Sequence, residues 1–150
     1  MSDEDRNKAL LRRFYEELWT KGNLEPIPEL LAEDFVNYHP LPGAAPGREG
    51  LAALLTTWLT AFSDMCETCE DLIAEGDKVV GRFPMGGTHS DEFMGVPPTG
   101  RHVTMSGIDI VRVAGGKITE FWYSEHLLEL LQKLGAVPDF AADYAARDER

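Results

Sequence analysis

Asp109 is the side chain of this sequence whose position best suits acid/base chemistry. It lies inside the apolar run Ile-Asp-Ile-Val at 108–111, a pattern typical of a strand. A carboxylate is costly to bury there unless it is hydrogen-bonded, paired or functional. If Asp109 lines a cavity, desolvation raises its pKa towards the range of a general acid or base. The alternative is a structural role, as an edge-strand or dimer-rim carboxylate bonded to a neighbouring Arg or Tyr.

Three further side chains could act together with such a carboxyl group. Tyr123 could donate a hydrogen bond to a substrate carbonyl or enolate, although a tyrosine on an antiparallel strand is also a common packing residue. His126, beside Glu125, could shuttle a proton, or it could be a half-exposed surface histidine. His39 follows a short strand pattern and precedes a proline, at the expected mouth of a cavity.

Segment 86–100 is a candidate wall for that cavity. It is too rich in Gly and Pro for a helix or a central strand, yet it lies between two strand-like runs. It carries His89, two acids and two apolar residues, which suits a ligand-binding crossover as well as an ordinary surface connection. His89 could also fix this crossover by hydrogen bonding.

Residues expected to contact a ligand come from the helices, the first strand, the crossover and the last hairpin. Most of the aromatic side chains are expected in the core, and a subset would line the wide end of a cavity. Tyr15 and Trp58 are the strongest candidates, because each offers a polar atom that a ligand could satisfy. The full set is Tyr15, Trp19, Asn37, Trp58, Phe62, His89, Phe93, Met105 and Phe121.

The sequence predicts neither a metal site nor a cofactor. Four scattered histidines form no H-x-H or H-E-x-x-H pattern, and no glycine-rich phosphate loop precedes a helix. Cys66 and Cys69 form a lone C-x-x-C without the second pair of ligands that zinc requires. We interpret them as two ordinary reduced thiols.

Composition and charge restrict the class of protein. A chain of 150 residues with 43% hydrophobic residues predicts one globular domain, here 1–138, followed by a peripheral helix or disordered tail at 139–150. The net charge of -12 disfavours nucleic acid and anionic membrane surfaces as partners. The charged start and the absence of a long apolar run predict no signal peptide and no membrane span, hence a cytoplasmic location.

The elements that must position these residues are mainly helices first and strands afterwards. Apolar residues recur at helical spacing over 5–20 and 48–62, and short helices are expected at 26–31 and 127–135. Strand patterns occur at 35–39, 66–75, 78–85, 102–113 and 117–127. This order predicts an α+β fold, in which three N-terminal helices cover a curled antiparallel sheet and leave a cavity between the layers.

The turn at 113–117 determines which residues share a face of the last hairpin. A three-residue loop with a bulge places Asp109 opposite Phe121, whereas a two-residue Gly-Gly turn would place it opposite Trp122. With the favoured three-residue loop, one face carries Met105, Gly107, Asp109, Val111, Phe121, Tyr123 and Glu125. The other face carries Ile108, Ile110, Arg112, Ile118, Glu120, Trp122, Ser124 and His126.

Both faces of this hairpin are partly apolar, and the helices of one subunit can cover only one of them. A large bare apolar face would be an aggregation liability. We therefore expect a homodimer that buries the face with Ile108, Ile110 and Trp122.

A series of short motifs resembles a known family. In order, they are RFYEELW (13–19), GREG (47–50), GTH (87–89), FMGVPPTG (93–100), GKI (116–118) and LLQKLG (130–135). Together they resemble the SnoaL-like polyketide (ester) cyclases of the nuclear-transport-factor-2-like superfamily, over about residues 8–135. The resemblance implies a cone-shaped α+β barrel, a homodimer, and closure of an aldol ring by an aspartate and a nearby histidine without metal or cofactor.

Two functions stay open, because the chain departs from the family pattern. Aligned on GKI, the family aspartate falls at Tyr123 and the histidine at Asp109, and a small shift would bring in Glu125 or His126 instead. The first function is a cofactor-independent enzyme that acts on a small apolar or aromatic carbonyl-bearing ligand by cyclisation, isomerisation or hydrolysis. Asp109 would be its main acid/base and Tyr123 its oxyanion donor, with His126 or His39 as a second proton carrier. The second is a non-catalytic pocket that binds a small molecule or a protein partner.

Overall fold

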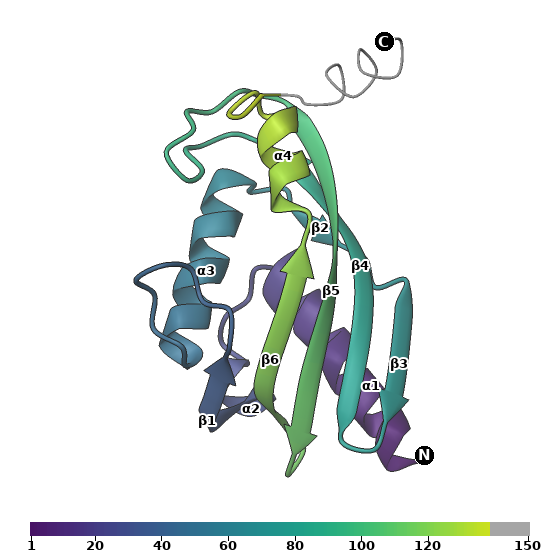
Figure 1. Cartoon of the computed structure of the whole chain (residues 1–150). Coiled ribbons are helices and arrows are strands. Elements are labelled where there is room, and N and C mark those ends of the chain that lie inside the picture. Colours follow the sequence, from purple (N-terminus) through teal and green to yellow (C-terminus); the bar gives the residue numbers. More distant parts are fainter. Residues whose placement is uncertain (139–150) are drawn as a thin grey trace, which may run out of the picture.

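The computed structural model describes residues 1–138, and the tail predicted at 139–150 lies outside the described residues. Helices cover one face of a curled, unclosed sheet (Figure 1), which confirms the predicted α+β fold. The sheet has the strand order β1-β6-β5-β4-β2, and β3 also pairs with β4. The strands are β1 (Leu31–Asn37), β2 (Cys66–Glu67), β3 (Asp71–Glu75), β4 (Lys78–Thr88), β5 (His102–Ala114) and β6 (Lys117–Glu125).

The helices follow the predicted pattern, with one change in geometry. Helix α1 (Asp3–Phe14) begins at Ser2, which forms a capping box with Asp5. It continues as the π-helix η1 (Tyr15–Thr20), so the helix predicted at 5–20 is one continuous rod with a widened last part. The remaining helices, α2 (Ile27–Leu30), α3 (Arg48–Ala61) and α4 (Leu127–Lys133), match the other predicted segments to within a few residues.

Two predictions about the strands are wrong. The sheet is not wholly antiparallel, because β1 pairs with β6 in parallel; no short hairpin joins these two strands, so their direction is free. The single strand predicted at 66–75 is two strands. The gap between them faces Pro84 of β4, which has no N–H to donate to a partner strand.

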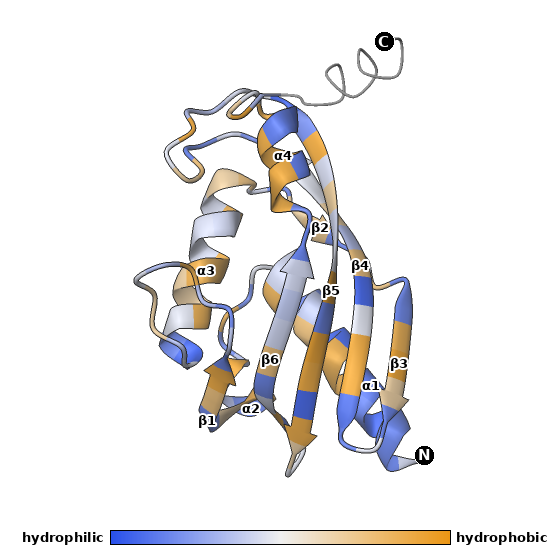
Figure 2. Ribbon diagram, in the orientation of Figure 1, coloured by the Kyte–Doolittle hydropathy of each residue, from blue (hydrophilic) through white to orange (hydrophobic). Residues whose placement is uncertain are grey.

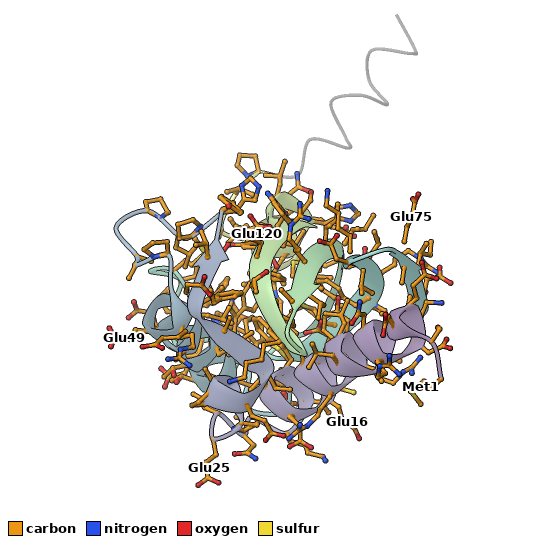
Figure 3. The ribbon with its side chains drawn as sticks, turned by 90° about the horizontal axis from the view of Figure 1, so that it is seen from below. Met1, Glu16, Glu25, Glu49, Glu75 and Glu120 are labelled. Atoms are coloured by element: carbon orange, nitrogen blue, oxygen red, sulfur yellow. The ribbon has the colours of Figure 1, made fainter. Side chains whose placement is uncertain are left out.

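The hydrophobic core lies between the helices and the concave face of the sheet. Leu11, Phe14 and Leu18 of the first helix are fully buried, as are Leu51 and Leu55 of α3. Hydropathy along the ribbon shows the hydrophobic stretches of α3 and the strands (Figure 2). Figure 3 shows carbon-rich side chains that fill the interior, whereas the labelled acids of the periphery project outward: Glu16, Glu25, Glu49 and Glu75.

The β5–β6 hairpin does not have the predicted register. Its loop has two residues, Gly115 and Gly116, whose φ angles of 59° and 75° suit a type I′ turn. A bulge at Thr119 then shifts the ladder by one more residue, so that Asp109 lies opposite Tyr123. The two-residue loop and the bulge each shift the register by one residue. Two such shifts leave each side chain on the face of the hairpin that the sequence predicts for it. The exception is Ile118, which precedes the bulge and is fully buried in the core.

Among residues 1–138, no helix is long and apolar enough to cross a membrane. Cys66 is exposed, Cys69 is half-buried, and both are free thiols.

Candidate active site

A small cavity lies between η1, α3 and the concave face of the sheet. Its volume is about 20 Å³, room for about one water molecule. It is lined by Trp19, Leu54, Glu67, Phe83, Met85, Asp109, Phe121, Tyr123 and Glu125. Three of these side chains carry carboxyl groups and none is a Lys or Arg, so the cavity is an acidic site inside an apolar core.

Asp109 is buried in this cavity, with 3% of its surface exposed. It lies between Gly81 of β4 and Tyr123 of β6 in the ladder. Burial raises its pKa well above the usual value; the Tyr15 hydroxyl partly offsets this rise, and the charge of Glu125 adds to it. The Tyr15 hydroxyl approaches from η1 without the geometry of a full hydrogen bond.

Gly81 is the reason that Tyr15 can reach the sheet beside Asp109. A Cβ atom at Gly81 would lie 2.2 Å from the Tyr15 hydroxyl oxygen. Any larger residue would therefore push the tyrosine off the floor of the site. The burial of Tyr15 raises its pKa, and the charge of Asp109 raises it further, so its phenol stays protonated.

Two glutamates complete the acidic lining. Glu125, at the end of β6, has a pKa raised to about 7 by burial. Glu67, on β2, is 7% exposed, and its Oε1 atom has no hydrogen-bond partner among the described residues. Burial raises the pKa of Glu67 well above its usual value, and the negative charges of Asp109 and Glu125 raise it further.

Tyr123 presents its phenol to the same cavity. It is half-buried, and burial raises its pKa to about 12. Its ring stacks on Phe121 with ring centroids 5.4 Å apart. His39, which is exposed, lies at the other edge of this ring with a centroid distance of 6.1 Å, so it stands at the rim of the site.

His126 and Asn37 are directed away from the cavity. The His126 side chain is 63% exposed and faces the Ser106 hydroxyl and the Glu129 carboxylate. The Asn37 side chain accepts a hydrogen bond of 2.9 Å from the backbone N–H of His39, and thereby holds the turn after β1.

The other residues predicted to contact a ligand, those of the crossover apart, line two separate cavities. Trp19 and Phe121 line the acidic cavity, whereas Trp58, Phe62 and Met105 line a second cavity of about 10 Å³. Met85 borders both cavities.

The crossover residues His89 and Phe93 lie outside the lining of both cavities. The backbone N–H of Thr99 donates to His89 Nδ1 over 3.2 Å, and the His89 ring stacks on Phe62. Phe93 packs against Trp58 with ring centroids 4.6 Å apart. The crossover therefore closes over the aromatic cluster of α3.

Sequence reasoning missed Leu54, Glu67, Phe83 and Met85 of the lining, and Glu67 is the one of these that carries a titratable group. It lies in a polar run, Cys-Glu-Thr-Cys at 66–69, which resembles an exposed strand. Its burial comes from Thr20 at the end of η1, whose hydroxyl donates to the Glu67 carbonyl and accepts from the Glu67 N–H, each over 3.0 Å. A contact across 47 residues leaves no local pattern.

A larger depression lies elsewhere on the surface. It has a volume of about 920 Å³ between the start of α1 and the β3–β4 and β5–β6 turns, and its lining includes Ser2, Arg13 and Gly115. None of the candidate residues lines it. Within residues 1–138, no three His, Cys, Asp or Glu side chains are arranged to hold a metal ion.

The three acids predict how stability depends on pH. The folded chain keeps protons on Glu67, Asp109 and Glu125 at pH values where the unfolded chain has lost them. The free energy of unfolding should therefore fall as pH rises from about 4.5 through about 7. Urea unfolding should give a higher midpoint at about pH 5 than at about pH 8, and Glu125→Gln should reduce the difference. A midpoint that rises over this interval would contradict the protonation states assigned here.

The chain belongs to the SnoaL-like polyketide cyclase family, whose model matches residues 9–134. Among curated relatives, it is 29% identical to the aklanonic acid methyl ester cyclase DauD of Streptomyces sp. (strain C5), over 74% of this chain and 70% of DauD. The solved structure of TsrD from Streptomyces laurentii is similar, with a TM-score of 0.82 and 27% identity over 91% of this chain and all of TsrD. The putative polyketide cyclase IdmH from Streptomyces antibioticus is 37% identical, with a TM-score of 0.74 over 89% of this chain and 99% of IdmH.

Proposed function

We propose that this protein is a cofactor-independent cyclase, which binds an apolar or aromatic carbonyl-bearing ligand and closes a ring by acid/base chemistry. The observation that carries this proposal is the position of Asp109 and Tyr123. They lie opposite each other on β5 and β6 and line one buried cavity. A carboxyl group and a phenol side by side can supply a proton and a hydrogen bond to a reacting oxygen.

An aldol ring closure needs only proton transfers from the protein. A base removes a proton from the carbon beside one carbonyl group, and the electron pair moves onto that carbonyl oxygen. The carbon then bonds to a second carbonyl carbon, whose oxygen becomes an alkoxide and takes up a proton. Substrate and product are isomers, so the reaction consumes no oxidant or reductant.

Each step has a suitable group in the cavity. Glu125 suits the base, because a pKa of about 7 leaves much of it ionised near neutral pH. Asp109, whose pKa is raised by burial, suits the acid that protonates the alkoxide. Tyr123 stays protonated and can donate a hydrogen bond to the same oxygen. Transfer of a proton from Glu125 back to Asp109, directly or through water, restores the site.

The lining favours an uncharged ligand. The lining has no Lys or Arg to pair with a carboxylate, and the ionised form of Glu125 would repel one, whereas an ester or a ketone brings only hydrogen-bond acceptors. The methyl ester in the name of DauD is a ligand of this kind. A ligand of that size requires the cavity to widen, and the flexible Met85 between the two cavities is the side chain best able to move.

A non-catalytic pocket is the second candidate, and the small volume of the cavity favours it. The two candidates differ in what they do to aklanonic acid methyl ester. A cyclase should convert the ester to a product of identical mass and different chromatographic retention, much faster than buffer alone. A binding protein should protect or retain the ester unchanged, and mass spectrometry after chromatography distinguishes the two.

A second copy of the chain is the proposed partner of the outer sheet face. An apolar row crosses the strands there, formed by Ile73, Val80, Ile110 and Trp122, and Tyr38 stacks on Trp122 with ring centroids 5.0 Å apart. Charged rows with both signs flank it, among them Arg82 with Asp71 and Arg112 with Asp77. An apolar centre between mixed charges is complementary to its own copy in a two-fold arrangement.

Light scattering at micromolar concentration should therefore give about twice the chain mass of 16.7 kDa. Ile110→Lys places a charge in the middle of the apolar row and should give the monomer mass with an unchanged circular dichroism spectrum. The exposed Glu25→Lys, in the loop before α2 and away from the outer sheet face, serves as the control and should remain dimeric. A monomeric wild type would rule the dimer out.

A further inference from the structure

We propose that Glu67 is a substrate-contacting residue that donates a hydrogen bond to a second carbonyl oxygen of the ligand, across the cavity from Asp109 and Tyr123. This inference rests on the proposed function and assigns a binding contact to the second of the two carbonyl groups that an aldol closure needs. Nothing in the sequence motifs indicates such a role.

The first observation is the unsatisfied carboxyl oxygen of Glu67. Its Oε1 atom is buried, lacks a hydrogen-bond partner among residues 1–138, and belongs to a side chain that lines the acidic cavity. A buried polar atom without a partner destabilises the fold, so such an atom in a cavity lining points to a ligand that satisfies it. The Tyr15 hydroxyl is a second such atom in the same region.

The second observation is the way in which Glu67 is held. The strand β2 has only two residues, and the Thr20 hydroxyl binds both backbone groups of Glu67 from the end of η1. The same π-helix carries Tyr15 and Trp19, which lie beside Asp109 and in the cavity lining respectively. Widened helical turns of this kind occur often at functional sites. Thr20 is thus a positioning residue that aims Glu67 inward.

The third observation is the place of Glu67 in the sheet. Glu125 and Tyr123 lie on β6, Asp109 on β5, and Glu67 on β2 beyond β4. In the sheet, β2 and β6 lie on opposite sides of the β5–β4 pair, so Glu67 lines the cavity from the side opposite Tyr123 and Glu125. One carbonyl group held at the Asp109–Tyr123 pair leaves Glu67 unpaired, whereas a second one can reach it. Burial keeps the carboxyl group protonated and able to donate, since its pKa is raised well above the usual value.

The test compares two ketones that differ by one carbonyl group, 1,4-diacetylbenzene and acetophenone. Their dissociation constants are measured by quenching of tryptophan fluorescence, since Trp19 lines the cavity. The wild type should bind the diketone more tightly, by about three- to tenfold, the value of one neutral hydrogen bond. Glu67→Met, which keeps the unbranched shape, should abolish this preference. Glu67→Gln, whose amide can donate, should retain it, as should the exposed control Glu75→Gln.

Several results would overturn the assignment of Glu67. These are equal binding of the two ketones by the wild type, a preference that survives in Glu67→Met, and failure to bind either ketone. If Glu67→Met does not fold, binding of the two ketones is compared in Thr20→Val. This variant should weaken the preference for the diketone, because it misaligns Glu67. Turnover plays no part in this experiment. A chain that closes the ring of aklanonic acid methyl ester but shows no diketone preference would retain the proposed function and lose only this inference.

Discussion

Asp109→Asn should lower the rate of ring closure by about two to four orders of magnitude, the usual effect of removing a general acid or base. The substitution keeps the shape of the side chain and removes the proton that the alkoxide would take. The folded state should persist or become more stable, because folding at neutral pH no longer requires a buried carboxyl group to take up a proton. The measurement is the rate per folded molecule, with the folded fraction taken from urea unfolding of the same sample.

A matched control separates this effect from a general loss of structure. Asp71→Asn changes a strand aspartate of β3 whose side chain is 56% exposed and paired with Arg82. It should leave the rate within about twofold, since exposed ion pairs contribute little to stability. If Asp109→Asn unfolds the protein while the rate per folded molecule is unchanged, Asp109 is a structural residue. The acid would then have to be sought at His39, the histidine at the rim of the cavity.

Glu125→Gln should remove the pH dependence that we assign to the base. In the wild type, kcat/KM should rise with pH and level off above about 7, because the ionised form of Glu125 takes the proton and its pKa is about 7. In the variant, this inflection should disappear and the rate should fall by about two to four orders of magnitude. The exposed Glu129→Gln, on α4, should keep both the inflection and the rate. An unchanged inflection in Glu125→Gln would assign the base to another group.

Asp109 could be predicted as a site residue because its charge interrupts an apolar strand, which is a local signal. The face that it shares with Tyr123 was also predictable from strand alternation. Its partner in the ladder was not, because Gly115-Gly116 suits loops of two or three residues and nothing in the sequence marks the bulge at Thr119.

The features that could not be predicted depend on contacts between segments that are far apart in the sequence. Glu67 is placed in the cavity by the pairing of β2 with β4 and by the hydroxyl of Thr20, which comes from a distant segment. The parallel pairing of β1 with β6 likewise depends on the path of the chain through α3, which carries no residue-level signature. The family resemblance supplied the architecture, and the apolar strand marked Asp109, whereas Glu67 came from the structure alone.

A crystal structure with aklanonic acid methyl ester bound to the slow Asp109→Asn variant would test the central claim most directly. The account predicts that the ligand occupies the acidic cavity after Met85 has moved. One carbonyl oxygen should then lie within about 3.2 Å of the Tyr123 hydroxyl or of the amide that replaces the Asp109 carboxyl group. A ligand bound outside this cavity, in the depression beside the start of α1 or on the outer sheet face, with Tyr123 and the substituted side chain untouched, would contradict it.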